Sequence, residues 1–255
     1  MDILTRKENG VLTIEFNRPQ KKNAITAAMY QVMADAIRDG EGDATVRAFV
    51  IAGKPEIFTA GNDLEDFMKH SATPAGESPV SQFMRALSGA QKPVVAAVAG
   101  NAVGIGTTLL LHCDLVYAAE NAKFALPFVQ LGLCPEFASS MLLPQIVGYP
   151  RAAEKLLLGE AFSAEEAYEM GLVSRVVPSL ELADFVQAQA VRLALLPASS
   201  LRVTKRLMKG AQADAVKARM QEENRHFGEM LSAPEAKEAF TAFFEKRKPD
   251  FRKFS

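Results

Sequence analysis

A single carboxylate, Glu136, lies among apolar and small residues in the stretch LGLCPEFASS at 131–140. In one interpretation Pro135 and Glu136 begin a helix, because proline suits the first turn and a carboxylate complements the helix dipole. In the other, Glu136 is a base in an apolar pocket, where desolvation raises its pKa toward working pH. The side chains that would form this pocket are Phe128, Leu131, Leu133, Phe137 and Ala138. For an isolated Pro-Glu pair the helix start is favoured, so the rest of the sequence must decide.

Two glycine turns offer backbone N–H groups to a developing negative charge. In FTAGNDLEDF, at 58–67, Gly61 permits a backbone conformation closed to other residues, and Asn62 or Asp63 can begin a helix. From this stretch alone, a glycine turn followed by a helix cap is favoured. The functional alternative is an amide at a helix start that stabilises an oxyanion.

The second turn, GNAVGIGTTLLLHCD at 100–114, places three glycines after an apolar run. It resembles the nucleotide-binding turn of short-chain dehydrogenases. However, it follows a hundred residues of chain, and no tyrosine has a lysine four residues on. The dehydrogenase interpretation is therefore disfavoured. A second oxyanion donor and simple close packing of a helix on a strand both remain open.

The sequence gives little indication of a metal site or of a serine-hydrolase active site. The histidines and cysteines form no ligand cluster, which argues against a structural metal and suits a reducing compartment. They are His70, His112, His226, Cys113 and Cys134. We expect His112, in LLLHCD, to be a satisfied core or helix-end residue. Ser139 and Ser140 lack the GxSxG elbow of serine hydrolases.

Composition narrows the class of protein. The 255 residues carry a formal charge of −1, so the net charge indicates neither a nucleic-acid nor an anionic-membrane partner. An anionic ligand would need local basic residues. We find no secretory signal, no apolar run near the ~20 residues of a membrane span, and no C-terminal lipidation motif. The sequence predicts a soluble cytoplasmic enzyme.

The elements that would position these residues follow from the apolar pattern. Residues 11–16 alternate like a strand, and the apolar runs 46–53 and 93–100 predict strands buried on both faces. A helix begins after Asn23. The Pro-, Gly- and Ser-containing stretch 69–80 predicts a mobile loop that covers a ligand.

Helices dominate after about residue 150. Ser163, Glu166 and Gly171 give a capped helix, and residues 172–177 predict a short strand ended by Pro178. Amphipathic helices then fill 181–247, with breaks at Pro197, Gly210 and Pro234. The sequence predicts an α/β core followed by a helical region.

Taken together, these stretches resemble the enoyl-CoA hydratase/isomerase family, the crotonase superfamily. The resemblance rests on NRPQKKNAIT, FTAGNDLEDF, KPVVAAVAGNAVGIG, CDLVYAAENAKFALPFVQLGL and GEAFSAEEAYEMGLVSRVV. It implies an α/β spiral of ββα units at 1–195 and a helical C-terminal trimerisation region at 196–255. The implied partners are an acyl-CoA substrate and further copies of the chain, in a homotrimer or dimer of trimers, with no cofactor and no metal.

The resemblance also implies roles for individual residues. The family stabilises a thioester enolate with two backbone amides, which here belong to Asn62 and Ile105. Its hydratases need two glutamates, whose positions are occupied by Thr108 and Phe128. A third position carries the acid of the Δ3,Δ2-enoyl-CoA isomerases, and here it is Glu136. The implied substrate-binding residues are Ala60, Gly61, Asp63, Leu64, Gly104 and Phe128.

We therefore expect a Δ3,Δ2-enoyl-CoA isomerase with one base, similar in GNDLEDF and PFVQLGLCPEFASSMLLP to the peroxisomal-type branch. The alternatives are a hydratase-like or other enolate-forming acyl-CoA enzyme, and a family member that binds CoA without catalysis. Candidates for holding the CoA phosphates are Arg18, Lys21, Lys22, Lys246 and Arg247. Four aromatic residues near the C-terminus predict an exposed patch that oligomerisation would cover. These residues are Phe240, Phe243, Phe244 and Phe251.

Overall fold

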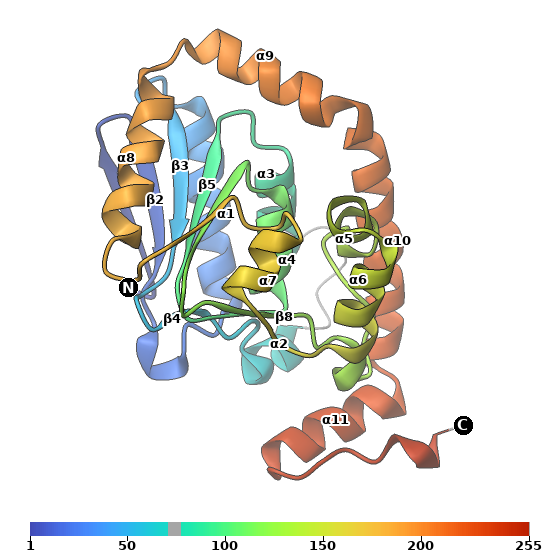
Figure 1. The fold of residues 1–255 in the computed structure, drawn as a ribbon. Helices are drawn as coiled ribbons and strands as arrows, with labels where there is room; N and C mark the ends of the chain where they lie inside the picture. Colours follow the sequence, from blue (N-terminus) through green and yellow to red (C-terminus); the bar gives the residue numbers. More distant parts are fainter. Residues whose placement is uncertain (71–77, 255) are drawn as a thin grey trace.

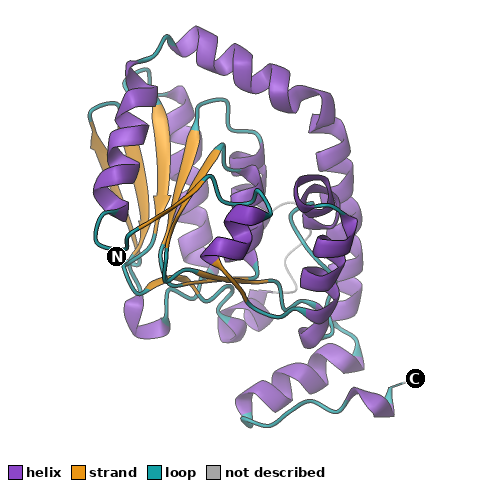
Figure 2. Ribbon diagram, viewed as in Figure 1, coloured by secondary structure: helices purple, strands orange, loops and turns teal. Residues whose placement is uncertain are grey.

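The computed structural model describes residues 1–70 and 78–254. Its strands form two sheets, which Figure 2 shows with the small sheet across one end of the large one. The large sheet has six strands in the order β1-β2-β3-β5-β7-β10, and the small sheet has four in the order β4-β6-β8-β9. The large sheet contains β1 (Ile3–Glu8), β2 (Val11–Phe16), β3 (Ala48–Ala52), β5 (Val94–Val98), β7 (Leu115–Ala119) and β10 (Arg175–Val177). The small sheet contains β4 (Ile57–Thr59), β6 (Asn101–Val103), β8 (Lys123–Ala125) and β9 (Phe162–Ser163).

From β3 to β8, successive strands alternate between the two sheets. β3, β5 and β7 each add a parallel strand to the large sheet, and β4, β6 and β8, which follow them, add parallel strands to the small sheet. Gly100, between β5 and β6, has φ +64 and lies against the backbone of Glu56 with no room for a Cβ atom. Glycine is therefore required where the chain passes from one sheet to the other. The predicted spiral of ββα units is confirmed.

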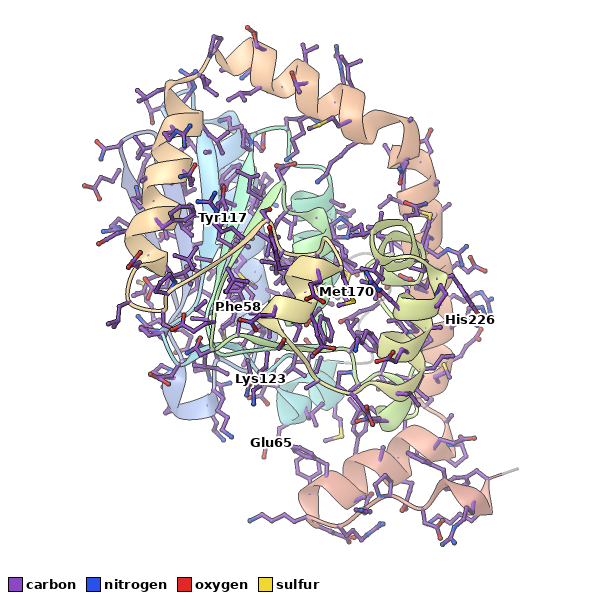
Figure 3. The ribbon with its side chains drawn as sticks, in the orientation of Figure 1. Phe58, Glu65, Tyr117, Lys123, Met170 and His226 are labelled. Carbon is purple, nitrogen blue, oxygen red and sulfur yellow. The ribbon has the colours of Figure 1, made fainter. Side chains whose placement is uncertain are left out.

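Helices cover both faces of the large sheet (Figure 1). Alternate residues of β3 show this directly, because Phe49 and Ile51 join the main core while Val50 joins the cluster beneath α8. Phe58 of β4 lies in the main core and Tyr117 of β7 lies in the α8 cluster (Figure 3). Both faces of β3 are thus buried, as its continuous apolar run predicted.

The described helices are α1 (Ala27–Gly42), α2 (Leu64–His70), α3 (Pro79–Ser88), α4 (Ile105–Thr108), α5 (Ser139–Val147), α6 (Tyr149–Ala153), α7 (Ala164–Glu169), α8 (Leu182–Leu195), α9 (Ala198–Lys209), α10 (Ala213–Leu231) and α11 (Pro234–Phe244). Several begin where the sequence predicted. The Thr26 side chain caps α1 by accepting a hydrogen bond from the Met29 amide at 3.3 Å. Ser163 and Glu166 form the predicted capping box of α7. The breaks at Pro197, Gly210 and Pro234 are confirmed.

The C-terminal helices form an arc around the core (Figure 1). Two lysines join α9 to the core: Lys205 Nζ donates to Asp114 at 2.6 Å, and Lys209 Nζ donates to the carbonyl of His112 at 2.8 Å. α10 then contacts α5, and α11 extends away from the two sheets. Residues from α10 therefore reach the segment that contains Glu136.

Some local expectations were wrong. β1 was not predicted, because Arg6, Lys7 and Glu8 make its outer residues polar. Residues 172–174 precede β10 rather than belonging to it. In the expected loop 69–80, residues 69–70 end α2 and 79–80 begin α3; residues 71–77 lie outside the described residues.

The aromatic patch is also smaller than expected. Phe240 is 5% exposed and packs in the main core, and Phe251 is partly buried. Phe243 and Phe244 remain exposed, at 59% and 46%. The helical spacing of α11 explains the difference, because one face of the helix packs on the chain itself.

Candidate active site

The two glycine turns lie side by side, at the carboxyl ends of neighbouring parallel strands. β4 pairs with β6 so that Thr59 lies opposite Ala102. Asn62 and Ile105 each come three residues after these paired positions, so the topology brings both to one edge of the small sheet. Their approach is close: a Cβ atom on Gly106 would lie 2.5 Å from the Thr59 methyl carbon.

In the first turn, one backbone amide remains without an acceptor. The N–H of Ala60 donates to Lys22 O at 3.0 Å, and that of Gly61 donates to the Thr59 hydroxyl at 3.1 Å. The N–H of Asp63 donates to Ile25 O at 2.9 Å. The N–H of Asn62 has no acceptor among the described residues. Gly61 makes this geometry possible with φ +88, as predicted.

The second turn also presents unbonded amides. Gly104, at φ +56, is the N-cap of α4 and its own N–H donates to Ala125 O at 2.9 Å. The amides of Thr107 and Thr108 donate back to the Gly104 carbonyl. The N–H groups of Ile105 and Gly106 have no acceptor in the described part of the chain, as expected for the first turn of a helix. A donor therefore comes from each of the two adjacent turns.

Side chains hold the first turn in place. The hydroxyl of Tyr30, on α1, donates to Asn62 Oδ1 at 2.5 Å. Asp63 caps α2 by accepting from the Asp66 amide at 3.2 Å, and it also accepts from Arg18 at 2.7 Å. Burial would raise the pKa of Asp63, but the hydrogen bond from Arg18 lowers it overall. Asp63 is thus an ionised structural partner of Arg18. Leu64 begins α2 and packs against the main core.

Glu136 is buried and incompletely bonded. Its side chain is 5% exposed, and Oε1 has no hydrogen-bond partner among the described residues. Burial, followed by the negative charge of Glu223, raises the pKa of Glu136 from 4.5 to about 8. A carboxyl group with such a pKa can exchange a proton near neutral pH. Glu136 is therefore not a solvated surface carboxylate.

The helix-start interpretation of Pro135 and Glu136 is wrong, since α5 begins only at Ser139. Between them lie Phe137 and Ala138, whose φ values of +61 and +57 are in the left-handed region. Non-glycine residues occupy this region at a cost and must be held there by their surroundings. Glu136 therefore lies on a tight turn before a helix.

Contacts from two elements hold this turn. The ring of His112 stacks on Phe137 and its Nε2 lies 2.8 Å from the Phe137 carbonyl oxygen. Burial lowers the pKa of His112 to about 4, so the neutral ring donates this hydrogen bond. As expected, His112 is a satisfied core residue. On the other side, Glu223 of α10 accepts from the amides of Ala138 and Ser140 at 2.5 and 2.9 Å.

The two positions occupied by glutamate in hydratases are both buried here. Phe128 is 5% exposed and lies three residues after β8, at the same edge of the small sheet as the two turns. Thr108 is fully buried, and its hydroxyl oxygen has no hydrogen-bond partner in the ranges described. Neither side chain can act as a carboxylate base at neutral pH.

The sequence did not identify Tyr30 or Glu223 as part of the site. Burial raises the pKa of Tyr30 well above its usual value, and the charge of Glu136 raises it further. Tyr30 thus lies within electrostatic reach of Glu136 and bonds Asn62 directly. In α1 it lies on the buried face beside Met29 and Met33, where periodicity indicates only a core residue.

The basic residues suggested for binding the CoA phosphates differ in their ion pairs and exposure. Arg18 is bonded to Asp63, and Arg247 forms ion pairs with Glu238 and Glu245. Lys21 and Lys22 are exposed, beside the first turn through the Lys22 carbonyl. Lys246 is exposed as well, so these three lysines remain candidates for binding the phosphates.

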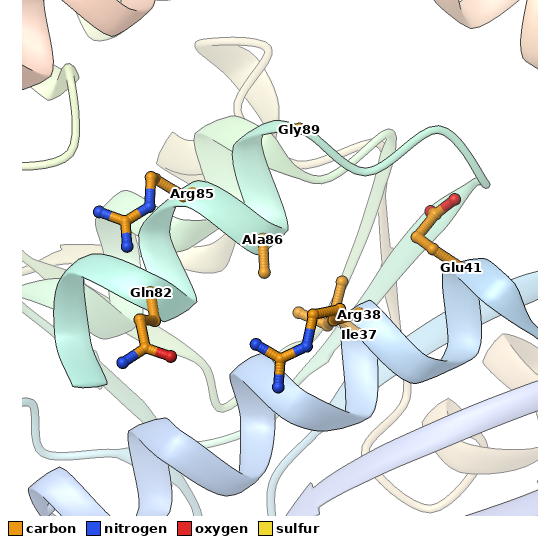
Figure 4. A pocket seen from close by; sticks show the side chains of 7 residues that line it. All are labelled: Ile37, Arg38, Glu41, Gln82, Arg85, Ala86 and Gly89. Atoms are coloured by element: carbon orange, nitrogen blue, oxygen red, sulfur yellow. The ribbon is translucent and has the colours of Figure 1, made fainter. Parts of the chain in front are cut away.

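A surface cleft of about 540 Å³ lies elsewhere, between α1 and α3 (Figure 4). It is lined by Ile37, Arg38, Glu41, Gln82, Arg85, Ala86 and Gly89. None of these is a predicted site residue, so the cleft is not part of this site.

Among the side chains that the structure describes, no group of three from His, Cys, Asp or Glu could hold a metal ion. His226 lies on α10 (Figure 3). Its Nδ1 atom is 3.6 Å from Glu229 Oε2. No described helix is long and apolar enough to cross a membrane.

Comparisons with known proteins match nearly the whole chain to one family. The family model described as "Enoyl-CoA hydratase/isomerase" matches residues 6–253. The 1,2-epoxyphenylacetyl-CoA isomerase of Escherichia coli is 35% identical, over 98% of this chain and 97% of that protein. Enoyl-CoA delta isomerase 2 of Rattus norvegicus is 38% identical, over 87% of this chain and 58% of that protein. A crystal structure of an enoyl-CoA hydratase/isomerase from Pseudoalteromonas atlantica superposes with a TM-score of 0.94 at 40% identity, over 98% of this chain and 100% of the other.

Proposed function

This chain belongs to the enoyl-CoA hydratase/isomerase family, and within it we propose that the protein is a Δ3,Δ2-enoyl-CoA isomerase with Glu136 as its base. The substrate is a cis- or trans-3-enoyl-CoA, and the product is the trans-2-enoyl-CoA. The observation that carries the proposal is the buried carboxyl group of Glu136. Its Oε1 has no partner among the described residues and burial raises its pKa to about 8, in a site that has Phe128 and Thr108 at the hydratase positions.

In the proposed reaction, the N–H groups of Asn62 and Ile105 donate to the thioester oxygen. This stabilises the negative charge that forms on the oxygen when Glu136 removes a proton from C2. Removal of one such donor typically lowers the rate by ~10²–10³, so these amides make a main contribution. Their free N–H groups, one on each of two adjacent turns, support this role.

The same carboxyl group then completes the reaction. In the dienolate, the C2–H electron pair has become a C1=C2 double bond and the carbonyl pair lies on the oxygen. When the C=O bond re-forms, the C1=C2 pair becomes the new C2=C3 double bond, and the electrons of C3=C4 bind the proton from Glu136 at C4. The proton moves from C2 to C4, and no atom is gained or lost. One carboxyl group suffices when C2 and C4 lie on the same side of the planar allylic system. The apolar Phe128 helps to exclude water from the dienolate.

Two of the relatives reported above are isomerases, which supports an isomerisation without net addition of water. Resemblance to the peroxisomal-type branch remains part of this proposal, as does assembly into a homotrimer or dimer of trimers. The exposed pair Phe243 and Phe244 supports assembly.

A comparison of two substrates tests the proposed function. We expect trans-3-hexenoyl-CoA to be converted to the conjugated 2-enoyl-CoA, seen as a rise in ultraviolet absorbance, and crotonyl-CoA to be hydrated slowly or not at all. Efficient hydration of crotonyl-CoA without isomerisation would instead identify a hydratase-like enzyme. Tight CoA binding without turnover of either substrate would identify a non-catalytic member of the family.

A further inference from the structure

The turn that carries Glu136 does not hold its shape through its own sequence. Phe137 and Ala138 both adopt left-handed backbone conformations without being glycine. Within the turn, the Ser139 hydroxyl donates to the Glu136 carbonyl at 2.6 Å. This contact stabilises the carbonyl of Glu136 but leaves the amides of Ala138 and Ser140 in need of acceptors.

One carboxylate from a distant helix supplies both acceptors. Glu223 Oε2 accepts from the Ala138 amide at 2.5 Å, and Oε1 accepts from the amide and the hydroxyl of Ser140 at 2.9 and 2.5 Å. Glu223 is 5% exposed and lies 85 residues from Ala138 in sequence. Three donors meet two oxygens, so the group required here is one that only accepts hydrogen bonds.

We propose that Glu223 is a positioning residue, whose carboxylate holds residues 137–140 in the conformation that keeps the Glu136 side chain buried. The C-terminal helix α10 thereby completes the active site. The expected effect of Glu223 on turnover rests on the proposed isomerase function. Its effect on the backbone conformation of residues 137–140 does not.

The negative charge of Glu223 also affects the pKa of Glu136. Both glutamates are buried, and the negative charge of Glu223 adds to desolvation in raising the pKa of Glu136. Burial raises the pKa of Glu223 itself, and the hydrogen bonds from Ser140 and Ala138 oppose that shift. The titratable and charged groups that interact electrostatically with this pair are Tyr30 of α1, Cys134 of the preceding segment, and Arg219 of α10. His112, before β7, contacts the turn through Phe137.

The test is Glu223→Gln, compared with Glu222→Gln as a matched control. Glu222 is a neighbouring exposed carboxylate on α10 that pairs with Arg219. In Glu223→Gln, the side-chain NH₂ group faces an amide donor, so the turn loses at least one hydrogen bond. We expect kcat with trans-3-hexenoyl-CoA to fall about 10- to 100-fold with little change in KM, because misplaced groups slow the chemical step.

The pH profile separates positioning from general stability. In Glu223→Gln the midpoint for ionisation of Glu136 should move to lower pH, because one of the two causes of its raised pKa is removed. Glu223→Asp keeps the charge with a shorter side chain, so its midpoint should stay near that of the wild type even if kcat falls. A wild-type kcat and midpoint in Glu223→Gln, or the same downward shift in Glu223→Asp, would overturn the proposal.

Two measurements do not depend on turnover. Carboxyl-carbon NMR can follow the titration of Glu136, with Glu136→Gln to assign its signal, and hydrogen exchange can follow the Ala138 and Ser140 amides. We expect a lower Glu136 pKa and faster exchange in Glu223→Gln but not in Glu222→Gln. If the wild type fails to isomerise 3-enoyl-CoA while these differences appear, the proposed function is wrong and the positioning role stands. If neither differs from the control, the positioning role is wrong whatever the activity.

Discussion

The methyl group of Thr59 occupies the space that a side chain on Gly106 would need. A Cβ atom at Gly106 would lie 2.5 Å from the Thr59 Cγ2 carbon, far inside van der Waals contact. Thr59 ends β4 and Gly106 follows Ile105, so this contact sets how closely the two oxyanion turns approach. The missing side chain at Gly106 is therefore a requirement of the site as well as of the fold.

Gly106→Ala should push the two turns apart and lower kcat. A loss of about 10- to 100-fold is expected, since this is the magnitude typical of a misplaced oxyanion donor or reacting group. Thr59→Ser removes only the obstructing methyl group and keeps the hydroxyl that accepts from the Gly61 amide. The double variant Gly106→Ala/Thr59→Ser should therefore recover most of the activity in a steady-state assay. Equal losses in the single and the double variant would contradict this relationship.

Glu136→Gln should increase stability at high pH. Because the pKa of Glu136 is raised from 4.5 to about 8, the folded state holds this proton more tightly than the unfolded state. Below pH 4.5 both states are protonated, and between 4.5 and 8 the unfolded state gains stability by ionising. The wild type thus loses free energy of unfolding through this window, by up to about 5 kcal/mol at ~1.4 kcal/mol per pKa unit. Glutamine does not ionise and avoids the loss.

Urea unfolding of both proteins at several pH values measures this difference. The free energies of unfolding should converge near pH 4 and separate toward pH 9, with the variant more stable. A constant difference across this range would show that Glu136 is not desolvated.

Phe128→Glu should impair isomerisation rather than create a hydratase. The new buried carboxyl group and Glu136 would raise each other's pKa, so Glu136 would be protonated at working pH. We expect at least a ~10-fold loss of rate near pH 7.5, on the scale of general-base contributions. We also expect little hydration of crotonyl-CoA, because Thr108 supplies no second acid. Phe128→Leu, which keeps the site apolar, is the control and should retain most activity.

Light scattering should show a trimer or a hexamer. Phe243 and Phe244 expose adjacent aromatic rings at the end of α11, and such a surface is usually covered in an assembly. Replacing both with serine should weaken association if they lie in an interface. A monodisperse monomer of the wild type at micromolar concentration would contradict the prediction.

Local features of the fold were predictable from the sequence because their causes are local. The runs that became β3 and β5 are apolar on both faces, and the capping box of Ser163 and Glu166 needs only four residues. The positive φ values of Gly61 and Gly104 likewise follow from residue type.

The support of the site was not predictable, because it depends on contacts between distant segments. In the sequence of α10, Glu223 resembles any polar residue of an amphipathic helix, and only the fold brings it to Ala138. Tyr30 occupies a core position in α1, and its hydroxyl finds Asn62 across 32 residues. The turn at Phe137 could not be predicted either, since its backbone conformation is held from outside.

The most direct test of the central claim is the turnover of trans-3-hexenoyl-CoA by Glu136→Gln beside the wild type between pH 6 and 9. The wild-type rate should rise with pH and level off above about 8, as Glu136 ionises. Glutamine keeps the shape of the side chain but cannot accept the proton, so the rate should fall by about 10³-fold or more. Binding of CoA should change little. If the variant kept more than roughly a tenth of the wild-type rate, Glu136 would not be the base, since a sole general base contributes ~10²–10⁴-fold.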